Sequence, residues 1–275
     1  MITKTKETTT LENGVEMPLL GLGTYLAEPG EVEGAIQSAL EIGYRSIDTA
    51  TLYQNEESIG NALKEASVSR EDIFLTSKVW NSDQGYDNTL KAFDHSLQKL
   101  GTDYLDLYLI HWPVKGKFID TWKALEKLYD EERVRAIGVS NFLVHHLEKL
   151  MEKSEVKPMV NQVEFHPRLV QKDLMLYCIE HNIQQEAWSP IMKGRVNDIA
   201  ILKEMAEKHH KTPAQIVLRW DIQHGIVTIP KSVHRERIQE NFNIFDFELS
   251  EDEMAKIDML DQHDRIGPDP DHVNF

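Results

Sequence analysis

The stretch YRSIDTATLYQNEESIG, residues 44–60, contains the pattern on which the predicted fold depends. Its segment SIDTA, residues 46–50, is short, rich in β-branched residues and followed by a turn-like exit, as is typical of a buried strand. A carboxylate, Asp48, lies near the carboxyl end of this strand, and a phenol, Tyr53, follows in the loop. A carboxylate in an apolar strand requires a partner, which the rest of the chain must supply.

Similar β-rich runs recur along the whole chain, with amphipathic helical segments such as residues 31–43, 89–101 and 120–132 between them. The eight runs are residues 19–24, 46–50, 73–79, 105–112, 134–140, 159–165, 184–189 and 226–230. Most of these strands start about 25 to 30 residues apart, which is enough for a strand, a helix and two loops. Eight such units in a chain of this length predict an α/β fold, a closed (β/α)8 TIM barrel.

Two additions to the barrel are expected. Residues 8–20 contain Glu-Asn-Gly between two strand-like arms, which predicts a β-hairpin that caps the amino-terminal mouth. Residues 198–211 and 212–225 predict two helices, hence one extra helix between strands seven and eight, the second starting at Thr212-Pro213. Because no linker or internal repeat interrupts the chain, we expect one domain over residues 1–275.

Composition excludes several classes of protein. Apolar residues make up 41% and charged residues 28% of the chain, and no apolar run approaches the ~18 residues of a membrane span. The start, MITKTKETTT, lacks the apolar core of a secretory signal, and the single cysteine, Cys178, allows no internal disulfide, so we expect a cytoplasmic protein. A net charge of −16 argues against nucleic acid and makes the basic cluster at residues 231–237 informative.

In barrels of this kind, chemistry takes place at the carboxyl ends of the strands. The polar residues expected there are Asp48, Tyr53, Lys78 and His111. Lys78 follows an apolar run, so its ammonium needs a partner, and Asp48 is the expected one.

A lysine cation about 4 Å from a phenol favours the phenolate by up to about 4 kcal/mol, before burial opposes it. We therefore expect Lys78 to lower the pKa of Tyr53 and make it a general acid, with His111 holding the reacting oxygen. Each residue alone also has a structural explanation, as a cap, a rim residue or a core histidine. Four such residues together, on neighbouring strands at one face of the barrel, favour a catalytic role.

Five segments carry a resemblance to a known family: residues 43–60, 105–113, 134–142, 160–167 and 229–241. In order and spacing they resemble the signature segments of the aldo-keto reductase superfamily, from residue 20 to the end of the chain. Among its members the chain is similar to the small bacterial glyoxal/methylglyoxal reductases and 2,5-diketo-D-gluconate reductases. The resemblance implies that Asp48, Tyr53, Lys78 and His111 form a catalytic tetrad, in which Tyr53 protonates a carbonyl oxygen while a nicotinamide delivers hydride to the carbonyl carbon.

The resemblance also implies NADPH as cofactor, bound across the barrel mouth without a Rossmann fold. It assigns Ser140, Asn141 and Gln162 to the carboxamide of the nicotinamide, Trp188 to its ring, and Ser189 to the pyrophosphate. Lys231, Ser232 and Arg237 would hold the 2′-phosphate, where basic side chains favour NADPH over NADH. The remaining cofactor contacts that it implies are Gly23, Thr24, Asp48, Val233, Glu240 and Asn241.

The expected shape of the substrate pocket follows from two short segments of the chain. Only residues 114–120 separate Pro113 from the next helix, and the tail beyond Leu260 is brief. We expect a shallow, partly open site that accepts small aldehydes, ketoaldehydes and dicarbonyls such as glyoxal, methylglyoxal and diketogluconate. Its lining residues are Tyr25, Trp80, His111 and Trp112.

Two other functions remain as alternatives. A metal-dependent barrel hydrolase would need His-x-His after the first strand, where this chain has Gly23-Thr24-Tyr25. His145-His146 and His209-His210 are expected to diverge and face solvent, so no metal is predicted. An NADPH-binding redox-sensing subunit with little turnover would share the same fold. Scattered surface charges offer no self-association patch, and monomer is the default expectation.

Overall fold

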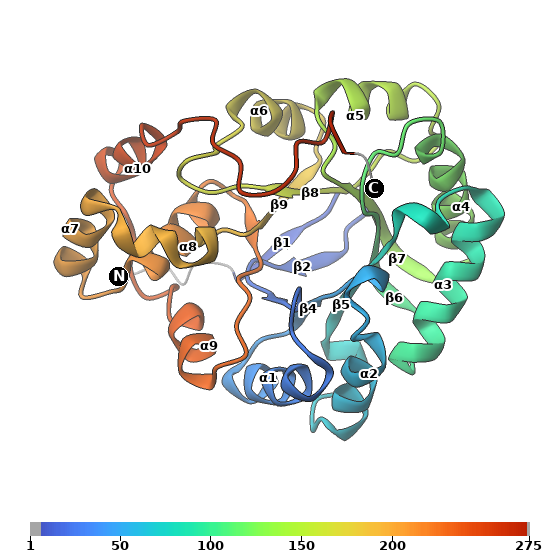
Figure 1. Cartoon of the computed structure of the whole chain (residues 1–275), viewed down its shortest axis with the longest axis horizontal. Helices are drawn as coiled ribbons and strands as arrows, with labels where there is room; N and C mark the ends of the chain where they lie inside the picture. Colours follow the sequence, from blue (N-terminus) through green and yellow to red (C-terminus); the bar gives the residue numbers. More distant parts are fainter. Residues whose placement is uncertain (1–6, 274–275) are drawn as a thin grey trace.

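The computed structural model describes residues 7–273 and consists of a ring of parallel strands surrounded by helices (Figure 1). The strands of the ring are β3 (Leu22–Gly23), β4 (Ser46–Asp48), β5 (Phe74–Val79), β6 (Leu105–Ile110), β7 (Val134–Ser140), β8 (Val160–Glu164), β9 (Gln184–Trp188) and β10 (Val227–Thr228). Each strand pairs in parallel with the next one along the chain.

The helices cover the outer face of the strands, as the amphipathic patterns predict. Their bounds are α1 (Pro29–Ile42), α2 (Glu56–Glu65), α3 (Tyr86–Leu100), α4 (Phe118–Asp130), α5 (Val144–Met151), α6 (Lys172–Glu180), α7 (Ala200–His209), α8 (Pro213–Gln223), α9 (Arg235–Phe242) and α10 (Glu251–Asp258). No helix in the described part of the chain is long and apolar enough to cross a bilayer.

The barrel closes where its first and last strands meet. Thr228 donates to the carbonyl of Leu19 at 2.9 Å, and the Gly21 amide donates to the carbonyl of Thr228 at 3.0 Å. A Cβ on Gly23 would lie 2.7 Å from the carbonyl oxygen of Ile229, so a glycine is required for this approach. These contacts confirm the predicted barrel, although β3 and β10 are shorter than predicted because the closing seam is held by isolated bridges.

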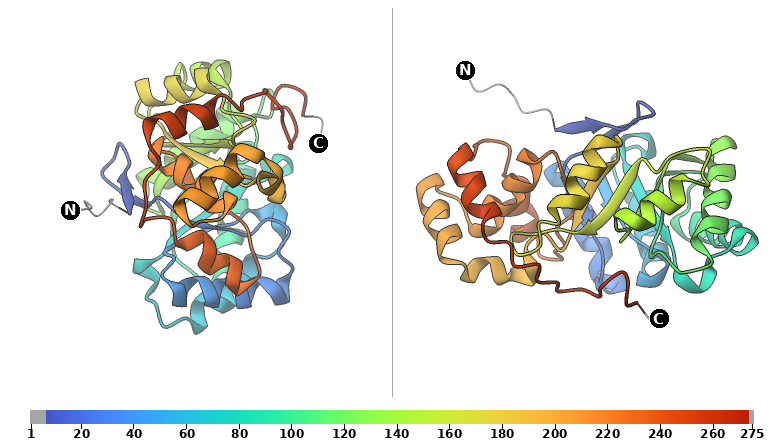
Figure 2. Two further views of the ribbon diagram at one scale, coloured as in Figure 1. Left: turned by 90° about the vertical axis from the view of Figure 1, so that its left-hand side faces the viewer. Right: turned by 90° about the horizontal axis from the view of Figure 1, so that it is seen from above.

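The predicted hairpin is present as β1 (Thr8–Thr10) and β2 (Glu16–Pro18), paired antiparallel. Thr9 donates to Gln184 at the start of β9, and Asn13 donates to the carbonyl of Arg135 in β7. The hairpin therefore lies over the amino-terminal end of the barrel, and the carboxyl-terminal tail lies at the opposite end (Figure 2).

Helices α7 and α8 both lie between β9 and β10, which confirms the extra helix. The predicted start of α8 is also correct: the Thr212 hydroxyl accepts the amide of Gln215 at 3.3 Å, and Pro213 occupies the first turn. Cys178 in α6 is buried, in agreement with a core role.

Candidate active site

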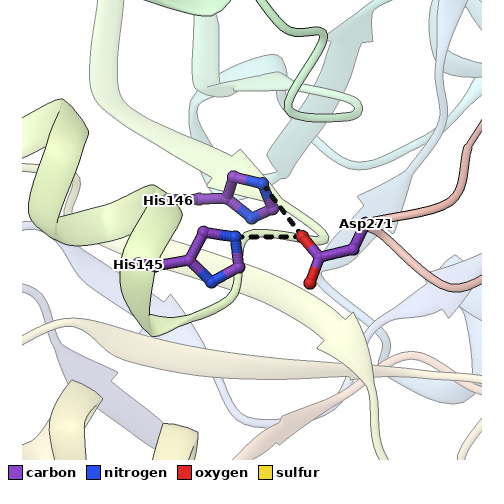
Figure 3. Close-up of side chains that lie close together, drawn as sticks. All are labelled: His145, His146 and Asp271. Atoms are coloured by element: carbon purple, nitrogen blue, oxygen red, sulfur yellow. Dashed lines mark ion pairs between the residues drawn. The ribbon is translucent and has the colours of Figure 1, made fainter.

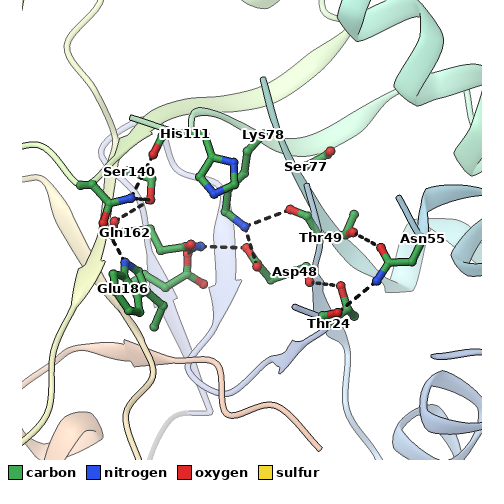
Figure 4. Close-up of polar contacts among 12 residues, drawn as sticks. Thr24, Asp48, Thr49, Asn55, Ser77, Lys78, His111, Ser140, Gln162 and Glu186 are labelled. Carbon is green, nitrogen blue, oxygen red and sulfur yellow. Dashed lines mark hydrogen bonds and ion pairs between the residues drawn. The ribbon is translucent and has the colours of Figure 1, made fainter. Parts of the chain in front are cut away.

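The centre of the site is a buried ion pair between β4 and β5 (Figure 4). Lys78 Nζ donates to Asp48 Oδ1 at 2.6 Å and to the carbonyl oxygen of Thr49 at 2.9 Å. Lys78 is fully buried, and Asp48 is 2% exposed. The expected partnership of these two residues is therefore present, and both lie toward the carboxyl ends of their strands.

A chain of hydrogen bonds extends from Asp48 across the inside of the barrel (Figure 4). Gln162 Nε2 donates to Asp48 Oδ2 at 2.7 Å and to Glu186 Oε2 at 2.8 Å. Burial, and then the Asp48 carboxylate, raise the pKa of Glu186 to about 8. Glu186 is therefore protonated at neutral pH.

The backbone around Asp48 is fixed by a second set of contacts. The Thr24 hydroxyl donates to the Asp48 carbonyl at 2.8 Å, and Asn55 Nδ2 donates to the Thr24 carbonyl at 3.0 Å. The Thr49 hydroxyl donates to Asn55 Oδ1 at 2.8 Å. Asn55 is buried at the start of α2, and it ties the loop that follows β4 to the loop that follows β3.

Tyr53 ends the short 3₁₀ turn η1 (Thr51–Tyr53), and its ring centroid lies 5.2 Å from Lys78 Nζ. The residue as a whole is half-buried. Burial raises the pKa of Tyr53 to about 12, while the Lys78 ammonium acts in the opposite direction. The expected lowering of this pKa is wrong in its net direction, because the cost of burying a phenolate exceeds the attraction to the cation.

Lys78 itself stays charged. Burial alone would lower the pKa of its ammonium, but Asp48, and after it Tyr53, raise it above the ordinary value. His111 follows β6, and its ring packs edge-on against Tyr53 and Trp80 with centroids 5.8 and 5.1 Å away. Burial, helped by Lys78, places the pKa of His111 well below the usual range, so its imidazole is neutral.

The residues expected near a nicotinamide gather at the ends of β7, β8 and β9. Asn141, in a left-handed conformation with φ 63°, donates to the carbonyl of His111 at 3.0 Å. Trp188 Nε1 donates to Asn141 Oδ1 at 2.9 Å, and Ser140 donates to the carbonyl of Gln162 at 2.8 Å. The Nε2 of Gln162 is used by two carboxyl groups, which leaves its Oε1 as the acceptor for a carboxamide.

The basic cluster lies at the start of α9. Lys231 and Arg237 are exposed, and within residues 7–273 neither forms an ion pair, whereas Arg235 pairs with Glu41 at 2.6 Å. Ser232 is buried, and its hydroxyl accepts the amide of His234 at 3.1 Å. Two unpaired cations beside a helix start, on a protein of net charge −16, fit a dianionic phosphate.

The structure brings the other expected cofactor residues to the same face. Glu240 accepts the Thr212 hydroxyl at 2.8 Å, and Asn241 is buried beside it in α9. Gly23 ends β3 and Thr24 follows it, Ser189 follows β9, and Val233 lies before α9.

Aromatic rings border the Tyr53 side of the site. Tyr25 is 50% exposed, and its ring lies 5.0 Å from that of Tyr53. Trp80 is half-buried and Trp112 is buried, so only part of the expected lining is open to solvent.

The prediction that His145 and His146 diverge is wrong, although His145 is exposed as expected. Their rings lie 4.0 Å apart at the start of α5, and the Nε2 atoms of His145 and His146 lie 2.9 and 3.5 Å from Asp271 Oδ1 (Figure 3). Both rings therefore face the same tail residue, Asp271. His209 is also partly buried, because it contacts Glu253 at 2.9 Å.

His145, His146 and Asp271 have the composition of a metal site, and among residues 7–273 no other group of three or more such side chains brings its ligand atoms together. However, His146 Nδ1 accepts the amide of Leu143 at 3.2 Å. The neutral ring then carries its proton on Nε2, the atom that faces Asp271. A cation is also unfavourable at a helix start. The two imidazoles therefore serve here as polar contacts for Asp271 of the tail.

Known proteins that resemble this chain include several reductases. The aldo/keto reductase family model matches residues 19–262. The glyoxal reductase of Bacillus subtilis strain 168 is 59% identical over 276 residues, which is 100% of both chains. The 9,11-endoperoxide prostaglandin H2 reductase of Trypanosoma cruzi strain CL Brener is 57% identical over 267 residues, 96% of this chain and 94% of the relative.

A similar solved structure contains the expected cofactor. The crystal structure of a Gox0644 mutant in complex with NADPH has a TM-score of 0.94 and 44% identity to this chain, with 98% of each chain covered.

The sequence did not indicate Glu186, and its raised pKa has a measurable consequence. The folded protein holds this proton up to about pH 8, whereas the unfolded chain releases it near the ordinary value of 4.5, so Glu186 makes stability fall as pH rises through that window. Glu186→Gln keeps an acceptor for Gln162 and removes the ionisation. Between pH 5 and pH 9 the variant should lose less stability than wild type, by on the order of 2–4 kcal/mol.

Urea unfolding at both pH values measures this difference, with Glu57→Gln, an exposed acid in α2, as the control. Equal pH dependence in wild type and Glu186→Gln would show that Glu186 ionises freely in the folded protein.

Proposed function

The chain belongs to the aldo/keto reductase family, and from this premise we propose that it reduces small carbonyl compounds with NADPH as the hydride donor. The observation that carries the proposal is the buried pair of Lys78 and Asp48 beside Tyr53. A cation held next to an un-ionised phenol, at the mouth of a barrel, suits the protonation of an oxygen that becomes negative during reaction.

The residues present fit NADPH. Lys231 and Arg237 offer the 2′-phosphate two exposed cations, and Trp188 offers the nicotinamide an aromatic surface. Ser140, Asn141 and the Oε1 of Gln162 supply partners for the carboxamide. When bound, the cofactor supplies the hydride that the carbonyl carbon receives.

The chain's own residues supply the proton. In the proposed reaction Tyr53 transfers its hydroxyl proton to the carbonyl oxygen as that oxygen gains negative charge. An alkoxide is more basic than a phenolate, so a phenol with a pKa of about 12 still donates favourably. Lys78 stabilises the phenolate that forms, Asp48 holds Lys78, and neutral His111 orients the oxygen. Solvent then returns a proton to Tyr53.

Glyoxal, methylglyoxal and small aldehydes are the proposed substrates, and diketogluconate is a further candidate. The relative named as a glyoxal reductase supports the dicarbonyl class, while the relative named as a prostaglandin H2 reductase defines the contrasting case. We further propose a cytoplasmic monomer, in keeping with the single buried cysteine and the dispersed charges.

Consumption of NADPH with methylglyoxal, glyoxal and prostaglandin H2 as separate substrates tests this assignment. Turnover of the two dicarbonyls supports it. NADPH binding without turnover of any carbonyl compound would favour the redox-sensing subunit instead, and turnover of prostaglandin H2 alone would contradict the proposed substrate class.

Replacing the proposed acid should remove activity and leave the barrel intact. Tyr53→Phe deletes one oxygen, and kcat for methylglyoxal should fall by about 10²–10⁴-fold, the usual contribution of a positioned general acid. Steady-state kinetics measures the loss, and an unchanged Kd for NADPH shows that the site is still folded. Tyr129→Phe at the end of α4 is the matched control, because the Tyr129 hydroxyl contacts Asn13 of the hairpin at the opposite end of the barrel. A rate near that of wild type for Tyr53→Phe would exclude this residue as the proton donor.

The cofactor preference depends on Arg237. Arg237→Ala should weaken NADPH binding by roughly 1.5–3 kcal/mol, the range of a charge-assisted hydrogen bond, and should scarcely change NADH binding. Arg235→Ala is the control, because Arg235 lies two residues away and is already paired with Glu41. Isothermal titration with both cofactors gives the four affinities. Equal losses for NADPH and NADH would mean that Arg237 does not contact the 2′-phosphate.

A further inference from the structure

The carboxyl-terminal tail, residues 261–273, leaves α10 and crosses the catalytic mouth of the barrel (Figures 1 and 2). The loop after β8 holds its first part. The amides of Gln262 and Asp264 both donate to the carbonyl of Arg168, at 3.1 and 3.0 Å. Arg265 donates to Gln171 Oε1 at 3.1 Å. The tail is therefore attached to the loop next to the proposed cofactor site.

A buried carboxylate fixes the next two residues of the tail. Glu164, the last residue of β8, accepts the amide of Ile266 on Oε1 at 2.6 Å and the amide of Gly267 on Oε2 at 3.1 Å. His166 contacts the same Oε1 at 3.0 Å. Burial opposes ionisation of Glu164, but these hydrogen bonds outweigh it and lower its pKa. Both oxygens of the carboxylate are thus used to hold the tail.

Gly267 then contacts Trp188. A Cβ on Gly267 would lie 2.3 Å from Trp188 Cη2 and 3.2 Å from Trp188 Cζ3, which are atoms of the six-membered ring. The opposite edge of the indole is held by the hydrogen bond from Nε1 to Asn141. The indole is consequently fixed at both edges, by Asn141 on one side and by the tail on the other.

We propose that Glu164 and Gly267 are positioning residues for the cofactor: they hold the tail against Trp188 and so set the plane of the indole that faces the nicotinamide. This inference rests on the proposed function. Glu164 places the tail, and Gly267 has no side chain, so the tail reaches the ring without displacing it. At the far end of the tail, the contacts of Asp271 with His145 and His146 hold the segment in place.

Gly267→Ala tests the contact. Its Cβ must displace either the indole or the tail, and Kd for NADPH should rise about tenfold, while kcat at saturating NADPH changes less than about threefold. Gly34→Ala is the matched control, because Gly34 is exposed in α1 and an added Cβ has nothing within 4 Å. Isothermal titration and steady-state kinetics supply the two readouts.

A double-mutant cycle shows whether Gly267 acts through Trp188. Trp188→Phe removes the part of the ring that the new Cβ would meet, so adding Gly267→Ala in that background should change Kd by less than about twofold. Equal losses in both backgrounds, or no loss in Gly267→Ala, would overturn the inference. Wild-type protein that binds no NADPH would contradict the proposed function itself, and with it this role in cofactor binding.

Trypsin cleavage after Arg265 tests, without any cofactor, whether Glu164 holds the tail. Gln has one acceptor oxygen in place of two, so Glu164→Gln should leave one of the two amides of Ile266 and Gly267 without an acceptor and speed this cleavage by about tenfold. Mass spectrometry follows the loss of residues 266–275, and Glu57→Gln is the control. If a Glu164→Gln protein with an unchanged unfolding temperature is cleaved at the wild-type rate, Glu164 does not hold the tail. If that variant does not fold, the same cleavage is measured in Gly267→Ala, whose Cβ would lie 3.2 Å from Glu164 Oε2. Faster cleavage than in wild type supports the attachment of the tail to Glu164, and cleavage at the wild-type rate overturns it.

Discussion

The structure of the site depends on one constraint, the burial of the Lys78 ammonium inside an apolar barrel. A buried charge of this kind costs several kcal/mol unless a partner and hydrogen bonds compensate it. Asp48 and the carbonyl of Thr49 do so at 2.6 and 2.9 Å. Asp48 in turn accepts a hydrogen bond from Gln162, which also donates to Glu186. The polar interior of the catalytic end is therefore one connected network around a single cation.

This network supports the proposed role of Tyr53 as proton donor at neutral pH. Burial keeps the phenol un-ionised, and Lys78 lies close enough to stabilise the phenolate once the proton leaves. In the proposed reduction the phenolate charge is absent before the proton transfer and present after it, so the attraction to Lys78 acts on the product of that step. The site is preorganised for a negative charge that only the reaction creates.

The sequence predicted the features that depend on local pattern. Eight β-rich runs at regular spacing predict the barrel, and polar residues at strand ends identify Asp48, Lys78 and His111. Glu186 was missed because it lies inside a strand whose two faces the sequence does not distinguish. The contact of Asp271 with His145 and His146 was missed because more than a hundred residues of chain separate them. The direction of the Tyr53 pKa was wrong because it depends on how completely the fold encloses the hydroxyl, which no local pattern records.

The central claim is that Tyr53 remains a protonated phenol beside a buried cation. Carbon-13 NMR of protein labelled at tyrosine Cζ, with the Tyr53 signal assigned by its absence from a Tyr53→Phe variant, measures this pKa directly. With a pKa of about 12, the Tyr53 signal should barely shift up to about pH 11. A titration midpoint below the ordinary value of 10.0 would contradict the account, because it would mean that the attraction of Lys78 exceeds the cost of burial.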